Sequence, residues 1–247
     1  MTAETTSKLP ALWLFDFDRT LAILEPVVDW PASRRALEAE LRSSKLPPSL
    51  LDELIAAIPR GNLPLYEALR ARLLDSPQGS SIKLAIDDAH AILARASSVI
   101  ELHEIAGVDE ALPMAGAQEL PRALVARRAT CAVVTSNSSR TVELWLARHG
   151  LSATFQVIVG RDSLLALKPS PAMVKRAIEL CAPSDGAEVV FVGDSPADVG
   201  AAVAAKVRFF GIAADADRRT RLIQCGAASE SLFDSALQLG TALGIIP

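Results

Sequence analysis

The sequence of 247 residues has few of the features that mark disulfide-rich, membrane-spanning or nucleic-acid-binding proteins. It contains only three cysteines, Cys131, Cys181 and Cys225, which lie far apart, form no CxxC pair and are odd in number. There are 25 lysines and arginines against 29 aspartates and glutamates, so the net charge is −4. This composition predicts no disulfide framework, no nucleic-acid partner and no binding to anionic membranes.

Long apolar runs are also missing. No run approaches the roughly 20 residues that a membrane span needs. The first ten residues include Glu4 and Lys8 and no apolar stretch before Leu9, so a signal peptide is not expected. We therefore expect a cytoplasmic protein with reduced cysteines. Half of the residues are apolar, which is enough to bury a sizeable core in one large domain or in a domain with an insertion.

Five short apolar runs predict strands that are buried on both faces, which is typical of a parallel sheet. They cover residues 12–15, 131–135, 157–159, 189–192 and 207–212. From the second run onward they alternate with helical patterns at 141–149 and 171–180 and with a helix that opens at Ser195 and Pro196. This alternation predicts an α/β fold built from βαβ units.

The 94 residues from 21 to 114 contain no convincing strand and predict several helices separated by prolines. Helix starts are expected at Asp29 or Ser33 and at Ser49, and further helices at 65–74 and 82–105. This stretch is too long for a single crossover helix. We therefore predict a core formed by residues 1–20 and 115–247, and an inserted, all-helical subdomain formed by residues 21–114.

Two aspartates, Asp16 and Asp18, follow the first predicted strand. Buried carboxylates are costly unless they are paired or bind a cation, and ligands of open α/β sheets bind at the carboxyl ends of the strands. One carboxylate could act as a nucleophile and the other could transfer a proton, with a hard divalent cation between them. The alternative is that Asp18 or Thr20 only caps the next turn.

The second predicted strand runs into Thr135, Ser136 and Asn137. Hydroxyls and free backbone N–H groups at a strand-to-helix junction suit a phosphate oxygen. Ordinary capping by Ser138 or Ser139 explains the same pattern.

Two further polar segments complete the pattern. Lys168 precedes a helix that starts with proline, and alone it indicates little. Asp194 follows the fourth predicted strand, while Ser195 is a predicted N-cap with Asp198 at the third helical position. The acid pair, the hydroxyl, the lysine and Asp194 all lie at carboxyl ends of strands or in adjoining loops. Together they predict one site.

These segments resemble, in the same order, the motifs of the haloacid dehalogenase-like hydrolase superfamily. DxDxT stands at residues 16–20, the apolar strand that ends in Thr or Ser ends at Thr135, the lysine is Lys168, and GDSxxD stands at 193–198. The resemblance implies a Rossmann-like, three-layer core with a central parallel sheet. Residues 21–114 correspond to the C1 cap position, and GDSPAD resembles the subfamily of phosphoglycolate phosphatases and β-phosphoglucomutases.

The resemblance implies Mg²⁺-dependent phosphoryl transfer through an aspartyl-phosphate, with four catalytic residues. Asp16 would attack phosphorus, and Asp18 would protonate the leaving oxygen and then activate water. Thr135 would hold a phosphate oxygen. Lys168 would neutralise charge on Asp16 and on the phosphoryl group. Such chemistry depends mostly on positioning and on stabilising charge.

The resemblance also implies binding roles. Ser136 and Asn137 join Thr135 and Lys168 as predicted phosphate-binding residues. The predicted Mg²⁺ site consists of Asp16, the main-chain carbonyl of Asp18, and Asp194, with Asp198 and Ser195 supporting these ligands.

Arg19 stands where glycine is the commoner residue of the motif. One hypothesis is that its guanidinium faces the cap opening and binds an anionic substrate. The other is that Arg19 pairs with a cap carboxylate such as Glu25.

The predicted function is a phosphatase that acts on a small phosphorylated metabolite, as a monomer or a homodimer. Asp18 argues against dehalogenation, because dehalogenases of the superfamily lack the second aspartate. A phosphomutase of the β-phosphoglucomutase type would use the same core with a different cap. A phosphonate hydrolase would need a cap lysine, and nothing marks Lys45 or Lys83 for that role. A non-catalytic binding module is the remaining alternative.

Overall fold

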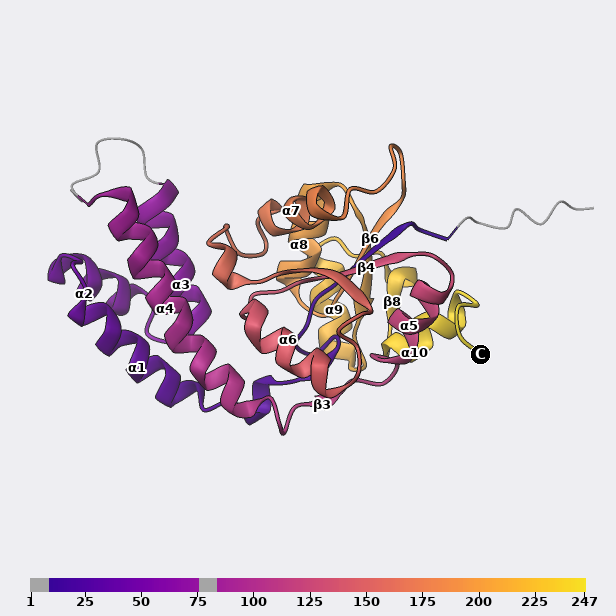
Figure 1. Ribbon diagram of the computed structural model, residues 1–247, viewed down its shortest axis with the longest axis horizontal. Helices are drawn as coiled ribbons and strands as arrows, with labels where there is room; N and C mark the ends of the chain where they lie inside the picture. The colour runs from indigo at the N-terminus through magenta and orange to yellow at the C-terminus, as the bar shows by residue number, and fades with distance from the viewer. Residues whose placement is uncertain (1–8, 76–83) are drawn as a thin grey trace, which may run out of the picture.

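The computed structural model describes residues 9–75 and 84–247. Figure 1 shows a central sheet with helices on both faces and, beside it, a separate block of helices. The sheet strands are β1 (Leu12–Phe15), β4 (Thr130–Val134), β5 (Phe155–Val159), β6 (Val189–Gly193), β7 (Arg208–Ile212) and β8 (Leu232–Phe233).

The strand order is β5-β4-β1-β6-β7-β8, and every neighbouring pair is parallel. All five predicted strands are present, each with ends within two residues of the prediction. The sequence did not indicate β8, because a two-residue edge strand carries too little apolar pattern. The predicted α/β fold with a parallel sheet is confirmed.

Six helices cover the two faces of the sheet: α5 (Glu119–Ala126), α6 (Ser139–Arg148), α7 (Ala172–Cys181), α8 (Pro196–Ala205), α9 (Ala216–Gln224) and α10 (Ala236–Ala242). Successive residues of β1 point to opposite faces, as the strand period requires. Leu12 and Leu14 join the core that contains buried residues of α7 and α8. Trp13 and Phe15 join the opposite core with those of α5, α6 and α10. These are the three predicted layers.

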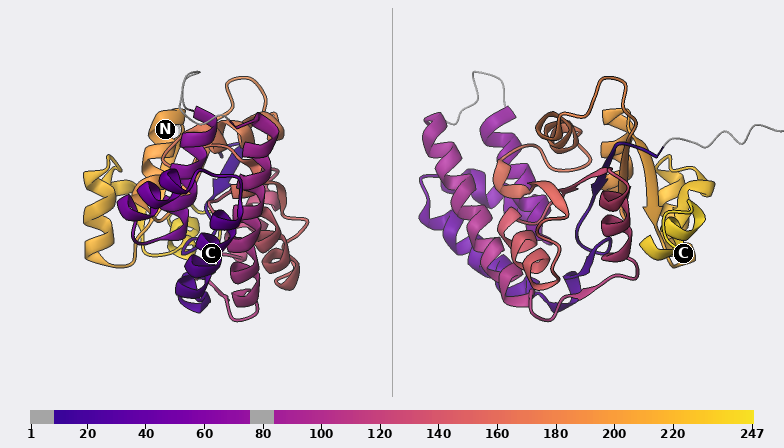
Figure 2. Two further views of the ribbon diagram at one scale, coloured as in Figure 1. Left: turned by 90° about the vertical axis from the view of Figure 1, so that its left-hand side faces the viewer. Right: turned by 45° about the vertical axis from the view of Figure 1, so that its right-hand side comes forward.

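Between β1 and α5 the chain leaves the sheet and returns. The segment contains β2 (Ala22–Ile23), α1 (Trp30–Ser43), α2 (Pro48–Ala57), α3 (Asn62–Arg70) with a π turn at Ala71–Asp75, α4 (Ile86–Gly107) and β3 (Leu112–Pro113). We call α1–α4 the helical insertion. Figures 1 and 2 show it as one block at one end of the molecule.

The prediction that residues 21–114 hold no strand was wrong. β2 and β3 pair in antiparallel fashion where the chain enters and leaves the helical insertion. Each strand has only two residues, so neither produces the alternation by which a strand is recognised in a sequence.

Local signals explain most helix starts in the insertion. Asp29 caps α1 by accepting a hydrogen bond from the Ala32 N–H (2.8 Å), so it starts the helix in preference to Ser33. The start predicted at Ser49 was wrong, because α2 begins at Pro48 with Pro47 as N-cap. Proline fits the first helical position, where the missing N–H has no partner in any case.

The two later helices also differ from their predicted ranges. The helix predicted over 65–74 begins at Asn62, after Gly61 at φ +82°, and α3 widens into the π turn after Arg70. The helix predicted over 82–105 begins at Ile86. Residues 82 and 83 lie outside the described residues.

Cys131, Cys181 and Cys225 are all free, as their number and spacing predicted. Within residues 9–75 and 84–247, no helix combines the length and the apolar character that crossing a membrane would require.

Candidate active site

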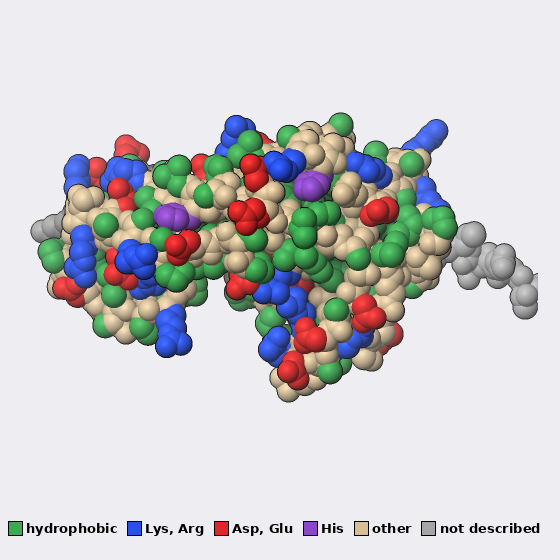
Figure 3. All heavy atoms as spheres, turned by 90° about the horizontal axis from the view of Figure 1, so that it is seen from below, with side chains coloured by type: hydrophobic (Ala, Val, Ile, Leu, Met, Phe, Trp, Pro, Cys, Tyr) green, Lys and Arg blue, Asp and Glu red, His purple; other side chains and the backbone are tan. Residues whose placement is uncertain are grey.

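The predicted site residues meet at the carboxyl ends of the central strands. Phe15 of β1 pairs with Val133 of β4 and with Val192 of β6, so the segments that follow these strands begin side by side. A pocket of about 600 Å³ lies between this sheet edge and the helical insertion. Every predicted site residue lines the pocket except Asp198, which is buried behind it. In Figure 3 the surface is hollowed beside the helical insertion, with acidic and basic side chains near the hollow.

The ammonium group of Lys168 joins three segments of the site. Its Nζ donates to Oδ1 of Asp16 (2.6 Å), to Oδ1 of Asp198 (2.5 Å) and to the carbonyl oxygen of Val134 (3.2 Å). Only 4% of the side chain is exposed. Burial lowers the pKa of Lys168, but the two carboxylates outweigh it and raise the pKa above its ordinary value. Lys168 is therefore a fixed positive charge beside Asp16.

Asp16 directly follows β1 and is buried. Burial raises its pKa well above the ordinary value, and the charges of Asp198 and Asp194 add to this, while Lys168 opposes it. Oδ1 is fixed by Lys168, whereas Oδ2 accepts no hydrogen bond from the described part of the chain. One oxygen is thus held and the other is available to react.

Asp18 lies on the same pocket wall. Its Oδ1 accepts hydrogen bonds from the backbone N–H groups of Leu24 (2.9 Å) and Glu25 (3.1 Å). The carboxylate therefore organises the next turn, as the capping alternative predicted, and it still reaches the pocket. Burial raises its pKa above the ordinary value, which favours the protonated form of the carboxyl group. Thr20 is buried and its hydroxyl has no partner in the described residues, so it does not cap this turn.

The turn after β6 is held by the predicted cap of α8. Ser195 and Asp198 form a reciprocal capping box. Oδ2 of Asp198 accepts from the N–H of Asp194 (3.1 Å), from the N–H of Ser195 (2.9 Å) and from Oγ of Ser195 (2.7 Å). A Cβ on Gly193 would lie 2.6 Å from the Asp198 side chain, so this turn requires glycine there.

Arg218 is a site residue that the sequence did not reveal. It lies on α9, after β7, and its Nη1 donates to Oδ2 of Asp194 at 2.5 Å. Burial and the charge of Asp198 raise the pKa of Asp194 to about 7, although Arg218 and Lys168 oppose the shift. Arg218 stands outside every recognised motif, and its only sequence signal is a position soon after a strand.

The acidic groups fit a hard divalent cation. Asp16, Asp194 and Asp198 each offer a carboxylate oxygen, and these three atoms lie within 4.8 Å of one another. Both oxygens of Asp198 already accept hydrogen bonds, whereas Oδ1 of Asp194 accepts none from the described residues. Carboxylate oxygens are the ligands that Mg²⁺ prefers. This donor set is compatible with Mg²⁺ on Asp16 and Asp194, with Asp198 orienting the turn.

The segment 135–138 joins β4 to α6. We call it the phosphate loop, after the roles predicted for Thr135, Ser136 and Asn137. Oγ1 of Thr135 accepts from the Asn137 N–H (3.1 Å) and donates to Oδ1 of Asn137 (3.1 Å). Ser138 caps α6 by accepting from the Thr141 N–H (3.1 Å), as the capping alternative predicted. Asn137 donates its side-chain amide to Glu104 (3.0 Å). These bonds do not support the prediction that Asn137 binds phosphate directly, because its amide stabilises the loop.

Residues 11–206 match the haloacid dehalogenase-like hydrolase family. The chain belongs to this family. A phosphoglycolate phosphatase from Pseudomonas putida is 29% identical over 207 residues, which are 83% of this chain and 70% of the relative.

Solved structures show the same fold. CbbY from Rhodobacter sphaeroides, determined with phosphate, superposes with a TM-score of 0.58 at 24% identity and covers 94% of this chain and 97% of its own. A protein from Thermotoga maritima described as a β-phosphoglucomutase gives 0.57 at 22% identity, covering 96% and 99%. The predicted superfamily and the prediction that the chain is an enzyme of the hydrolase class are confirmed.

Arg19 has a left-handed backbone in this hydrolase, with φ of 59°. Such a conformation favours glycine, which explains why glycine is the commoner residue at this motif position. The Arg19 guanidinium is ion-paired with the Glu25 carboxylate at the pocket edge. The second hypothesis for Arg19, pairing with Glu25, is confirmed.

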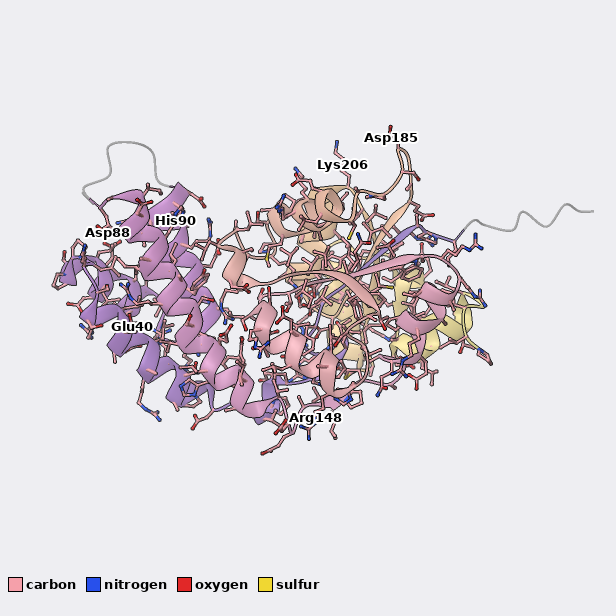
Figure 4. All side chains as sticks on the ribbon, in the orientation of Figure 1. Glu40, Asp88, His90, Arg148, Asp185 and Lys206 are labelled. Atoms are coloured by element: carbon pink, nitrogen blue, oxygen red, sulfur yellow. The ribbon has the colours of Figure 1, made fainter. Side chains whose placement is uncertain are left out.

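The helical insertion contributes a mainly apolar surface to the pocket, including Trp30, Leu63 and Pro64, and one carboxylate, Glu67 of α3. Lys168 is the only lysine that lines the pocket among the described residues. Lys45 is 72% exposed and pairs with Asp88, which Figure 4 shows on the helical insertion. Lys83 lies outside the described residues. The phosphonate-hydrolase alternative therefore gains no support from Lys45.

Proposed function

We propose that this hydrolase is a Mg²⁺-dependent phosphatase that cleaves a small phosphorylated metabolite through an aspartyl-phosphate on Asp16. One observation carries the proposal. A buried Asp16 has one oxygen fixed by Lys168 and the other available, within the same pocket as Asp18. A nucleophile, a fixed cation and a proton donor are the groups that phosphoryl transfer requires.

In the first step, Oδ2 of Asp16 attacks phosphorus and the ester P–O bond breaks. The leaving oxygen takes the proton of Asp18, whose raised pKa favours the protonated form. In the second step, Asp18 takes a proton from water, and the water oxygen attacks phosphorus. The bond between phosphorus and Asp16 breaks, which releases inorganic phosphate and restores the Asp16 carboxylate.

Residues of the chain would supply part of the charge stabilisation. Lys168 compensates Asp16, while Thr135 and Ser136 lie on the pocket wall where phosphoryl oxygens would bind. Asp16, the Asp18 carbonyl and Asp194 would hold Mg²⁺, which neutralises charge on the phosphoryl oxygens when bound. Asp198 and Ser195 would hold Asp194 in place through the capping box.

We assign residues 21–114 as a C1-type cap on the core of residues 1–20 and 115–247. The pocket between the two parts supports this assignment, because the helical insertion forms one of its walls. A wall of this kind can exclude water while the phosphoryl group is transferred.

The test is phosphate release from phosphorylated metabolites, phosphoglycolate and sugar phosphates among them, and from an aryl phosphate. We expect release that requires Mg²⁺ and disappears in Asp16→Asn. Asp185→Asn, in the exposed turn before β6, is the control and should retain activity. Interconversion of sugar phosphates without net release would instead identify a phosphomutase, and no reaction with any compound would indicate a binding module.

A further inference from the structure

Two fully buried charges lie behind the phosphate loop, outside every recognised motif. Glu104 is in the last turns of α4, and Arg161 opens the short helix η3 (Arg161–Ser163) after β5. Both side chains are 0% exposed. Nη1 of Arg161 donates to Oε1 of Glu104 (2.8 Å), and Nη2 donates to Oε2 (3.1 Å), which is a two-bond pairing.

The pair forms hydrogen bonds with three successive residues of the phosphate loop. Nη1 of Arg161 donates to the carbonyl oxygen of Ser136 (2.8 Å). Glu104 accepts from Nδ2 of Asn137 (3.0 Å) and from the backbone N–H of Ser138 (3.1 Å). The orientation of the peptide groups that follow Thr135 is therefore set by Glu104 and Arg161.

Arg161 also forms hydrogen bonds with the helical insertion. Its Nε donates to Oγ of Ser97 (3.1 Å), and its Nη2 donates to the Ser97 carbonyl oxygen (3.2 Å). The Tyr66 hydroxyl of α3 donates to the Arg161 carbonyl oxygen (3.4 Å). One guanidinium thus connects α4 to the loop that follows β4.

A contribution to the stability of the fold does not by itself explain why two charges are buried here. Desolvation of two charges offsets much of their attraction, and apolar replacements of buried ion pairs are often as stable or more so. What the pair supplies is a defined loop geometry, because each of its bonds reaches a different loop group. We propose that Glu104 and Arg161 are positioning residues that hold residues 136–138 for phosphoryl binding and connect that geometry to the helical insertion. This inference rests on the proposed phosphate-binding role of the loop.

The test compares Glu104→Gln with the wild type by calorimetric titration of inorganic phosphate in the presence of Mg²⁺. We expect phosphate affinity to fall by about tenfold or more, because small displacements of binding groups have large effects. The Mg²⁺ concentration that half-saturates thermal stabilisation should change by less than about twofold, because the substituted residue has no contact with Asp16 or Asp194. Leu120→Ala, in the opposite core, is the control that destabilises the fold without weakening phosphate binding.

Ser97→Ala provides a milder second variant, since it removes one bond from the insertion side. It should weaken phosphate binding by about threefold. Unchanged phosphate affinity in both variants would overturn the inference, as would a wild type that does not bind phosphate. Phosphate binding without turnover would overturn only the proposed phosphatase activity, so the two failures are distinguishable.

A separate observation concerns the charge of the substrate. Arg19 and Lys168 are the only cations that line the pocket within the described ranges, and both are already ion-paired. Arg19 pairs with Glu25, which lines the pocket as well. A carboxylate or a second phosphate on the leaving group would lose hydration without gaining a free cation.

On the side of the helical insertion, Trp30, Leu63 and Pro64 offer carbon surface, and the one charged residue that lines the pocket there, among those described, is the anionic Glu67. We infer that the leaving group is a neutral alcohol, so that phosphate esters of uncharged hydroxylated compounds bind better than esters of hydroxy acids. This inference deepens the proposed function. It predicts a substrate different in charge from phosphoglycolate, the compound in the name of the Pseudomonas putida relative.

The test measures binding of two esters of similar size, 2-hydroxyethyl phosphate and phosphoglycolate, to the Asp16→Asn protein with Mg²⁺. We expect the neutral ester to bind at least about fivefold more tightly, because only the other ester must bury a carboxylate. Glu25→Gln should narrow that ratio by freeing Arg19, whereas Glu230→Gln, on an exposed residue remote from the pocket, should not. Equal or tighter binding of phosphoglycolate by the parent protein would overturn the inference. Because binding needs no turnover, this result is independent of whether the wild type is a phosphatase.

Discussion

Charged side chains are used differently at the sheet edge and on the outer surface of the helical insertion. At the sheet edge, Lys168 and Asp198 are almost completely buried and their ion pair is joined by several backbone hydrogen bonds. In the insertion, Glu40 pairs with Arg95 and Asp88 with Lys45 on the surface, and Figure 4 shows Glu40 and Asp88 on these helices. Exposed pairs contribute little to stability, whereas buried ones persist only where many bonds compensate their desolvation. The comparison teaches that burial and bonding, rather than the number of charges, identify the functional region.

The strongest test of this difference between the two regions is to replace one lysine in each of them. Lys168→Met leaves Asp16 and Asp198 buried without their cation, so we expect kcat for phosphate release to fall about a thousandfold. Lys45→Met should leave kcat within about twofold, because its pair is exposed and remote from the pocket. Steady-state kinetics with an aryl phosphate measures both, and equal losses would contradict the assignment of Lys168.

The next largest effect is expected from a substitution that disturbs the packing around the buried carboxylate of Asp198. Gly193→Ala would place a methyl group 2.6 Å from the Asp198 side chain. We expect the free energy of unfolding to fall by about 2–3 kcal/mol, because the capping box cannot move without losing its bonds. Urea denaturation measures this change. Gly200→Ala cannot serve as the control, because its Cβ would lie 2.6 Å from the Pro169 side chain. Ala205→Gly at the end of α8 is the control, with an expected loss of about 1 kcal/mol or less.

Mg²⁺ should stabilise the protein in a pH-dependent way. Burial raises the pKa of Asp16 and of Asp194, the latter to about 7, above the values of the unfolded chain. The metal-free folded state therefore binds more protons than the unfolded state, and its stability falls as pH rises from about 4 through 7. A cation that binds the ionised carboxylates offsets this loss, and only where they are ionised.

We accordingly expect Mg²⁺ to raise Tm by several degrees at pH 8 and by about 1 °C or less at pH 5.5. Differential scanning fluorimetry measures both values, with NaCl at equal ionic strength as the control. Asp194→Asn should reduce the response at pH 8. An equal rise of Tm at the two pH values would argue against a carboxylate site.

The smallest expected effect concerns an exposed ion pair of the helical insertion. Asp88→Asn removes the charge partner of Lys45 on the insertion surface. We expect a change in the free energy of unfolding of less than about 0.5 kcal/mol, because such pairs are solvated and screened by salt. Thermal denaturation at low and high salt checks this expectation. A loss above about 1 kcal/mol would show that this surface ion pair stabilises the protein more than exposed pairs usually do.

The parts of the site that could be predicted lie in short stretches next to strands. Asp16 and Asp18 follow β1 directly, and Asp194 follows β6, so strand prediction also placed the carboxylates at one edge. The role of Asn137 could not be read in this way. Its amide bonds to Glu104, which is 33 residues away in the chain, and no local pattern marks that pairing.

The sequence by itself determined the parallel sheet, the order of its strands along the chain and the polar groups at the strand ends. Apolar runs and capping residues act over a few neighbouring positions, so each can be recognised locally. Only the tertiary structure decided that Glu104 meets Arg161 across 57 residues and that Arg218 reaches Asp194 across 24. It also decided that β2 pairs with β3. These contacts depend on where distant helices and loops pack, and a buried charge is stabilised only when that packing brings its partners together.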